Sequence, residues 1–272
     1  MNTIARPLDV VVAGATGWAG SAVVAAIVKS DDLRLAGAVA RSAAGRDAGE
    51  AVGLSPAGVT VAATLAEALR VPSDVVVDYT KPGAVKAHTL LALAEGRHVV
   101  IGTSGLSAAD YGEIDAAARA TGRGVIAAGN FSITATLLKR FALEAARYVP
   151  DIEVIDYAHA GKPDTPSGTS RELAEALAAI KREPKAKPVT ELAGIRETRG
   201  AALGEGTPVQ VHSLRLPSYV LACEAIFGAP DERLTIRHDA GSSAAPYVAG
   251  TLLAVRRVGE GVGLRRGLDS LM

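Results

Sequence analysis

One stretch of fourteen residues, 156–169, gathers side chains that could bind and protonate a small anion. His159 carries an imidazole, which exchanges protons near neutral pH, and Lys162 carries an ammonium group. The segment Ser167–Thr169 precedes a helical pattern, so it would cap a helix and present backbone N–H groups at the positive helix end. We therefore expect an anion-binding loop here. The alternative is an ordinary proline-containing surface loop followed by a helix cap.

The flanking residues place this loop between a strand and a helix. The apolar run 152–155 predicts a strand, and the Ala/Leu-rich run 170–180 predicts a helix. The value of the loop depends on the elements that surround it.

Composition limits the classes of function. The 272 residues suffice for two modest domains, and 49% hydrophobic with 21% charged residues argues for a globular protein. Lys+Arg and Asp+Glu both number 29, so no overall charge favours nucleic acid, and we expect none as a partner. The single Cys223 excludes an intrachain disulfide and lacks the neighbours that a metal site needs. We find no long apolar span or signal pattern, and therefore expect no membrane partner and a cytoplasmic location.

A glycine-rich turn near the start of the chain indicates dinucleotide binding. The apolar run 9–13 predicts a buried parallel strand, and the run 21–29 predicts a helix. Between them lies a turn with the spacing G-x-x-G-x-x-G, made of Gly14, Ala15, Thr16, Gly17, Trp18, Ala19 and Gly20. Such a turn lets the backbone approach a diphosphate at the helix N-terminus.

The end of the next strand bears on the choice of cofactor. A strand is predicted over residues 33–39, and a carboxylate after it would favour NAD. This chain instead has Arg41, with Arg46 nearby, so a 2′-phosphate would be attracted rather than repelled. We expect NADPH, with NADH remaining possible. The alternative is that Arg41 is simply a solvated side chain.

Strands alternate with helices through the rest of the first half. Strands are predicted at 59–61, 75–79, 98–101 and 124–128, and helices at 65–69, 84–94 and 108–120. This alternation predicts a Rossmann-type, doubly wound parallel sheet. Ligands bind at the carboxyl edge of such sheets. The cofactor-binding candidates at that edge are Thr80, Gly102, Thr103, Ser104, Ala128, Gly129, Asn130 and Phe131.

The second half has a different pattern. An amphipathic helix is predicted over 133–148, strands over 209–216, 219–227 and 233–239, and a helix over 244–257 that would return to the first domain. The charged run 181–187 is interpreted as a solvated loop. We expect an α+β fold for this part, with a mixed or antiparallel sheet.

Several short motifs, in this order, make the chain resemble the 4-hydroxy-tetrahydrodipicolinate reductase family. They are the Gly14–Gly20 turn, Asp-Tyr-Thr-Lys-Pro at 78–82, Gly-Thr-Ser-Gly at 102–105, Asn-Phe-Ser at 130–132 and Lys-Pro-Asp-Thr-Pro-Ser-Gly-Thr at 162–169. The resemblance implies a nicotinamide-dependent reductase of a cyclic imine-type dicarboxylate in lysine and diaminopimelate biosynthesis. It also implies a homotetramer built through the sheet of the second domain.

The resemblance implies roles for residues of the opening loop. Lys162, Ser167, Gly168 and Thr169 correspond to the segment that binds the substrate carboxylate. His159 corresponds to the second of two adjacent histidines, which contacts substrate.

The chain departs from the family pattern at the first histidine of that pair, the proton donor, where it has Ala158. His159 or Lys162 would then supply the proton, and both are our catalytic candidates. Trp18 also stands where the family often has an arginine. These departures keep open a reductase of another imine or oxo acid, or a non-catalytic NADP-binding sensor.

We expect a dinucleotide-binding domain over residues 1–129, completed by residues 241–272. A substrate-binding and oligomerisation domain would cover residues 130–240. No metal ion is expected in either.

Overall fold

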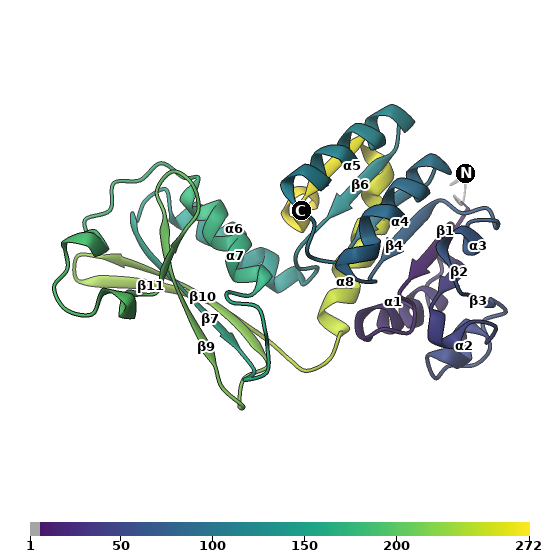
Figure 1. Ribbon diagram of the computed structural model, residues 1–272, viewed down its shortest axis with the longest axis horizontal. Helices are drawn as coiled ribbons and strands as arrows, with labels where there is room; N and C mark the ends of the chain where they lie inside the picture. The colour runs from purple at the N-terminus through teal and green to yellow at the C-terminus, as the bar shows by residue number, and fades with distance from the viewer. Residues whose placement is uncertain (1–5) are drawn as a thin grey trace. The chain divides into compact units, whose positions relative to one another are not determined.

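The computed structural model describes residues 6–272 and divides them into two compact units (Figure 1). One unit comprises the chain up to Ile133 together with Ala244–Met272, and the other comprises Thr134–Ser243. Residues 1–5 of the first expected domain lie outside the described residues. The C-terminal segment, residues 244–272, therefore completes the first unit.

The first unit contains a parallel sheet of seven strands in the order β12-β6-β5-β4-β1-β2-β3. The strands are β1 (Leu8–Ala13), β2 (Leu33–Val39), β3 (Val61–Ala62), β4 (Val75–Asp78), β5 (His98–Ile101), β6 (Gly124–Ala127) and β12 (Gly263–Arg266). The helices are α1 (Trp18–Val28), α2 (Ala48–Ala51), α3 (Leu65–Ala68), α4 (Pro82–Ala94), α5 (Ala108–Thr121) and α8 (Ala245–Arg257). The Rossmann-type fold predicted from the alternating pattern is confirmed.

Helices cover both faces of this sheet because its strands are apolar on both sides. In β1, Val10 and Val12 pack in the core that contains residues of α1 and α8. Val11 and Ala13 point the other way and pack in the core that contains residues of α4 and α5. A continuous valine run is the pattern expected for a strand buried on both faces.

The second unit contains a mixed sheet in the order β11-β10-β7-β9-β8. Its strands are β7 (Asp151–Ala158), β8 (Ala201–Leu203), β9 (Val209–Arg215), β10 (Leu221–Ala229) and β11 (Glu232–Ala240), and its long helices are α6 (Ile133–Ala145) and α7 (Gly168–Ala178). Strands β7 and β9 are parallel, and the other neighbours are antiparallel. The predicted α+β class is confirmed.

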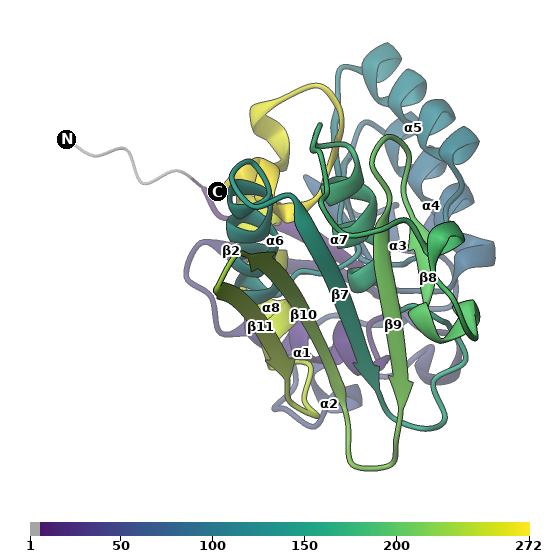
Figure 2. The same ribbon diagram turned by 90° about the vertical axis from the view of Figure 1, so that its left-hand side faces the viewer.

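Helices cover only one face of this second sheet. Leu138 of α6 and Leu173 and Leu177 of α7 pack on Val154 and Phe227 in one core. Figure 2 shows the opposite face of the strands turned toward the viewer. The segment after α7 reaches this uncovered face, where its Arg199 forms an ion pair with Glu153 of β7.

Two short strands were not predicted. Strand β12 reads Gly-Leu-Arg-Arg, without an apolar run, because it pairs only with β6 at the sheet edge. Strand β8 is also an edge strand, and its three residues lie within a turn-rich segment. Edge strands bury little surface, so their sequences carry little periodic signal.

Some predicted boundaries were wrong. The strand predicted at 59–61 is limited to Val61–Ala62, because the Asp47 carboxylate accepts from the N–H groups of Ala57 and Gly58 and shapes a loop there. The helix predicted to reach residue 148 ends at Ala145, and the Tyr148 N–H then bonds to the Ala145 carbonyl in a tight turn before Pro150. No helix among residues 6–272 is long and apolar enough to cross a membrane.

Candidate active site

The glycine turn after β1 is shaped by contacts that leave no room for side chains. Gly14 has φ +81°, and a Cβ there would clash with the carbonyl of Tyr79. A Cβ at Gly20 would clash with the Gly14 carbonyl. Helix α1 begins at Trp18 with neither a side-chain cap nor an acidic residue in its first turn. Its first N–H groups are therefore suited to a diphosphate, which the positive helix end attracts.

Arg41 lies just after β2, the position at which a Rossmann-type fold would meet the 2′-phosphate of NADPH. It opens a short 3₁₀ turn, Arg41–Ala43, directly after β2, and its side chain is exposed. The nearest carboxylate in sequence, Asp47, is occupied by the N–H groups of Gly49, Ala57 and Gly58 among others. Those backbone hydrogen bonds lower the pKa of Asp47. No described carboxylate forms an ion pair with Arg41, so its charge is available to a ligand.

A buried carboxylate, Asp78, ties together two of the predicted cofactor turns. It is the last residue of β4, fully buried, and accepts from the Thr80 N–H at 2.9 Å and the Thr80 hydroxyl at 2.7 Å. The Thr103 hydroxyl donates to it at 2.9 Å, and His88 Nδ1 lies 2.8 Å away. Burial alone would raise the pKa of Asp78, but these hydrogen bonds outweigh it and lower the pKa. Asp78 thus fixes the turns after β4 and β5.

The ring of Tyr79 packs against the turn after β5 and against Phe131. A Cβ at Gly102 would clash with this ring, so only glycine fits there. The Tyr79 ring also meets Phe131 edge-on, with centroids 6.2 Å apart. Because the Thr251 hydroxyl donates to the Tyr247 carbonyl, the Tyr79 hydroxyl is the donor in its 2.7 Å contact with Thr251. Phe131 itself is buried in the core, so only its backbone could face a ligand.

The remaining cofactor candidates lie at the same carboxyl edge of the sheet. Ser104 and Gly129 are exposed, whereas Ala128 is buried. The Asn130 side-chain oxygen accepts from the Ser132 N–H at 2.8 Å and closes the turn after β6. These residues form the surface on which the nicotinamide half of a cofactor would lie.

In the second unit, a second buried carboxylate holds the opening loop. Asp156 of β7 is fully buried and accepts from the Ser167 N–H at 3.0 Å and the Ser167 hydroxyl at 2.6 Å. It also accepts from the hydroxyls of Ser170 and Ser213 and from Arg215, the last at 2.8 Å. Burial would raise the pKa of Asp156, yet the bonds from Ser167 and Arg215 lower it. Arg215 also donates to the Asp164 carbonyl at 2.6 Å.

The predicted substrate residues differ in what they expose. Ser167 is buried, caps α7 and directs its hydroxyl to Asp156, so it shapes the loop. Gly168 is exposed in the first helical turn, and Thr169 beside it is half-buried. Because α7 begins at Gly168, the backbone N–H groups of these two residues lie at the positive end of the helix dipole, next to the loop.

His159 and Lys162 follow the end of β7. Lys162 Nζ lies 2.7 Å from Asp164 Oδ1 and is mostly shielded from solvent. His159 is exposed, and its ring lies near Gly161. Ala158 is fully buried at the last position of β7, opposite Leu221 and Arg215 on the neighbouring strands. A methyl group at this position can neither donate a proton nor reach solvent.

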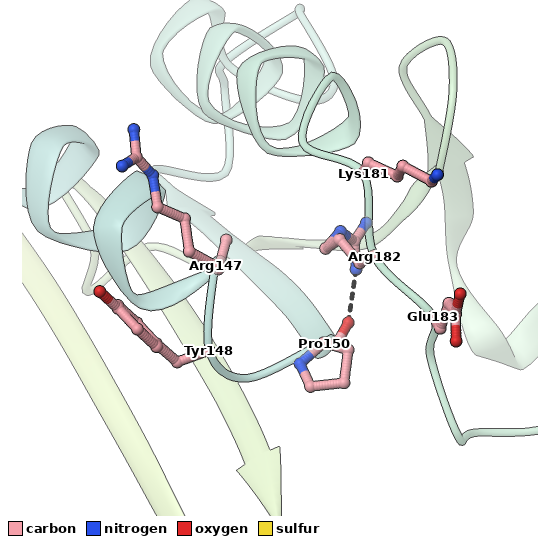
Figure 3. Close-up of a pocket in the computed structure, with 7 residues that line it drawn as sticks. Arg147, Tyr148, Pro150, Lys181, Arg182 and Glu183 are labelled. Carbon is pink, nitrogen blue, oxygen red and sulfur yellow. Dashed lines mark hydrogen bonds between the residues drawn. The ribbon is translucent and has the colours of Figure 1, made fainter.

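The prediction that residues 181–187 form a solvated loop was wrong for Arg182. This side chain is buried in a pocket of about 380 Å³ and donates to the carbonyls of Pro150, Thr207 and Pro208. Burial lowers the pKa of Arg182. Figure 3 shows that Arg147 and Lys181, which line the same pocket, direct their charged ends away from Arg182. Arg182 therefore joins three backbone segments, and the pocket gathers no converging charges.

Sequence reasoning gave no role to Asp78, Asp156 or Arg215, which hold the candidate residues in place. For the two aspartates a usable signal was present. Both aspartates interrupt or end an apolar strand just before a polar turn. An acidic residue at such a buried position must find hydrogen-bond donors, and loop hydroxyls are the nearest. Among the described residues, no cluster of three His, Cys, Asp or Glu side chains could hold a metal ion.

Comparisons with known proteins agree with this arrangement. Residues 8–131 match the family model for the N-terminus of dihydrodipicolinate reductase, and residues 134–271 match the model for its C-terminus. The 4-hydroxy-tetrahydrodipicolinate reductase of Synechococcus elongatus is 39% identical, with 99% of this chain and 100% of that protein covered. That of Desulfitobacterium hafniense (strain DSM 10664 / DCB-2) is 36% identical over 98% of this chain and 99% of that protein.

Solved structures show the same fold. Dipicolinate-bound dihydrodipicolinate reductase from Paenisporosarcina sp. TG-14 superposes with a TM-score of 0.82 at 28% identity, covering 98% of this chain and 100% of that one. An amine dehydrogenase from Mycobacterium smegmatis shares the fold alone, with a TM-score of 0.65 at 17% identity over 97% and 96% of the chains. Since both halves match in order and over their full length, the chain belongs to the dihydrodipicolinate reductase family of NAD(P)-dependent oxidoreductases.

Proposed function

We propose that this chain reduces 4-hydroxy-tetrahydrodipicolinate to tetrahydrodipicolinate in lysine and diaminopimelate biosynthesis, with NADPH as the preferred cofactor. In this reaction water leaves the substrate, and the ring gains a hydride and a proton. The observation that carries the proposal is the 156–169 loop, in a chain that matches the family over nearly its whole length. Asp156 holds the N-terminus of α7 through Ser167, and Arg215 links Asp156 to Asp164, the ion-pair partner of Lys162.

The substrate has two carboxylates, and the loop offers two ways to hold one. Lys162 would exchange its contact with Asp164 for a substrate carboxylate, which is an equivalent ion pair. Gly168 and Thr169 would donate from the first turn of α7, where the helix dipole favours an anion. Ser167 and Asp156 act indirectly, by fixing the geometry of these groups.

His159 is our proposed proton donor, with Lys162 as the alternative. Ala158 has no proton to give, whereas the exposed His159 imidazole is the next group along the chain. A general acid typically contributes about 10²–10⁴ in rate, so this assignment predicts a measurable role.

The residues of the first unit fit a dinucleotide. The uncapped N-terminus of α1 would hold the diphosphate, and Arg41 would pair with the 2′-phosphate of NADPH. When bound, the reduced nicotinamide supplies the hydride. The protein's own task is to orient it, through Thr80, Thr103 and Asn130, at the edge of the sheet. Residues 1–129 with 241–272 would thus form the cofactor domain, and 130–240 the substrate domain.

We also propose a homotetramer in the cytoplasm. The second sheet leaves one face without helices, and that face could pair with copies of itself. The buried, reduced Cys223 and the need for NADPH fit a reducing compartment. Light scattering at several protein concentrations would give the mass directly, and a monomer at all of them would refute the assembly.

The proposal is tested by following the loss of NADPH absorbance with freshly generated 4-hydroxy-tetrahydrodipicolinate. We expect turnover by the wild type, and Lys162→Met should keep NADPH binding while losing most of the turnover. Because Ala158 replaces the family's proton donor, a reductase of another imine or oxo acid is the second candidate. Turnover only with such compounds would support that candidate, and NADPH binding without any turnover would indicate a sensor.

A further inference from the structure

Trp18 is an exposed aromatic residue at the beginning of helix α1. It is the only tryptophan in the chain, in a sequence with 4% aromatic residues, and its side chain is 59% exposed. Leaving this much apolar surface in water is unfavourable by about 25 cal/mol for each Å². The indole lies beside the N–H groups at the start of α1, which would bind a diphosphate. A bound ligand at this position would cover the indole and remove its apolar surface from water.

The indole is held in place by Tyr247 of α8. The two rings meet edge to face, with centroids 5.5 Å apart and planes at 69°. Tyr247 in turn packs against the core, and its carbonyl accepts from the Thr251 hydroxyl at 2.7 Å. Since Thr251 also accepts from Tyr79, helix α8 joins the Trp18 end of the site to the turn after β4. The aromatic pair is therefore tied to the turn after β4 as well as to the start of α1.

We propose that Trp18 and Tyr247 form an aromatic wall that covers the diphosphate and the adjoining ribose of the bound dinucleotide. This inference rests on the proposed function, because it places the diphosphate at α1. The indole N–H can donate to a phosphate oxygen, and the ring excludes water from the hydrogen bonds between phosphate and helix N–H groups. The wall carries no charge, so it acts on the part that NADPH and NADH share, whereas Arg41 acts on the 2′-phosphate.

The test uses 2′-phospho-ADP-ribose, which has the diphosphate and the 2′-phosphate but no nicotinamide to quench tryptophan by energy transfer. Calorimetry measures its Kd, and tryptophan emission reports the surroundings of Trp18 alone. We expect the emission to shift to shorter wavelength on binding and iodide quenching to decrease. We also expect Trp18→Leu to weaken binding about tenfold, Trp18→Phe less, and Tyr247→Leu to fall between them.

Tyr148→Leu is the matched control, since Tyr148 is an exposed aromatic residue of the second unit, 76% exposed, and should leave the Kd unchanged. Binding by the wild type with an unmoved emission and an unchanged Kd for Trp18→Leu would overturn the aromatic wall. No binding of the probe or of NADPH to the wild type would instead overturn the proposed function.

Discussion

Two buried aspartates, one in each unit, do the same structural work with different partners. Asp78 ends β4, and Asp156 lies near the end of β7; each strand is the central one of its sheet. Both carboxylates are fully buried, and hydrogen bonds lower the pKa of each against the opposing effect of burial. Each fixes loops that carry candidate binding residues.

The partners differ in charge. Asp78 is satisfied by threonine hydroxyls, one backbone N–H and the ring of His88. Asp156 is satisfied by serine hydroxyls, one backbone N–H and the guanidinium of Arg215. The cofactor edge therefore depends mainly on neutral groups and glycine backbone, whereas the substrate loop depends on a buried ion pair.

The largest effect should come from removing the carboxylate at the charged centre. Asp156→Ala leaves Arg215 mostly buried without its counter-ion, and we expect it to lower the free energy of unfolding by about 3–5 kcal/mol. Asp78→Ala leaves only neutral or titratable partners and should cost less. Urea unfolding of both variants measures the difference. Equal losses would show that the ion pair is not what separates the two centres.

A change at the exposed end of the substrate loop should affect chemistry rather than the cofactor. We expect His159→Ala to lower kcat about 100-fold, because a positioned proton donor is lost, with the KM for NADPH unchanged. Steady-state kinetics at saturating substrate separates the two constants. Unchanged turnover would make His159 structural and leave the proton to Lys162 or water.

The corresponding change on the cofactor side should be smaller and selective. We expect Arg41→Ala to weaken NADPH binding about tenfold and to leave NADH binding unchanged, because only NADPH carries the 2′-phosphate. Calorimetry with both nucleotides checks this prediction. The exposed Arg46, a few residues away, is the matched control, and Arg46→Ala should have less effect. An equal loss for both nucleotides would argue against Arg41 as the selecting residue.

The smallest effect concerns acid stability. A carboxylate whose folded pKa is lowered contributes stability that is fully present above its unfolded pKa, about 3.9, and is lost as the pH falls through the folded pKa. Asp156 should therefore stabilise the protein at pH 6 and lose this contribution below about pH 4. Unfolding free energies at pH 6 and pH 3 should differ less for Asp156→Asn than for the wild type. A difference of the same size in both would assign the acid sensitivity to other carboxylates.

Most strands and turns of the first unit could be predicted from the sequence. Valine runs such as residues 9–13 belong to strands buried on both faces, and the Gly14–Gly20 spacing is required by the close approach of the backbone to itself and to Tyr79. The motif at 162–169 led to the family, which the full-length matches confirm. These features are local, so a single sequence reveals them.

The supporting residues could not be predicted because their partners are distant in sequence. Arg215 lies 59 residues from Asp156, and Thr251 lies 172 residues from Tyr79. Arg182 sits within a charged run that favours solvent, and only the tertiary fold brings three carbonyls to it. Periodicity describes which face of an element is buried, but it does not say which polar groups will meet there.

The central claim is that this chain transfers hydride to 4-hydroxy-tetrahydrodipicolinate although Ala158, at the end of β7, has no proton to donate. The most direct measurement uses NADPH deuterated at C4, prepared as each of the two stereoisomers, followed by mass spectrometry of the product. We predict one deuterium in tetrahydrodipicolinate from one isomer and none from the other. Absence of the reduced product, or a product without deuterium from either isomer, would contradict the account.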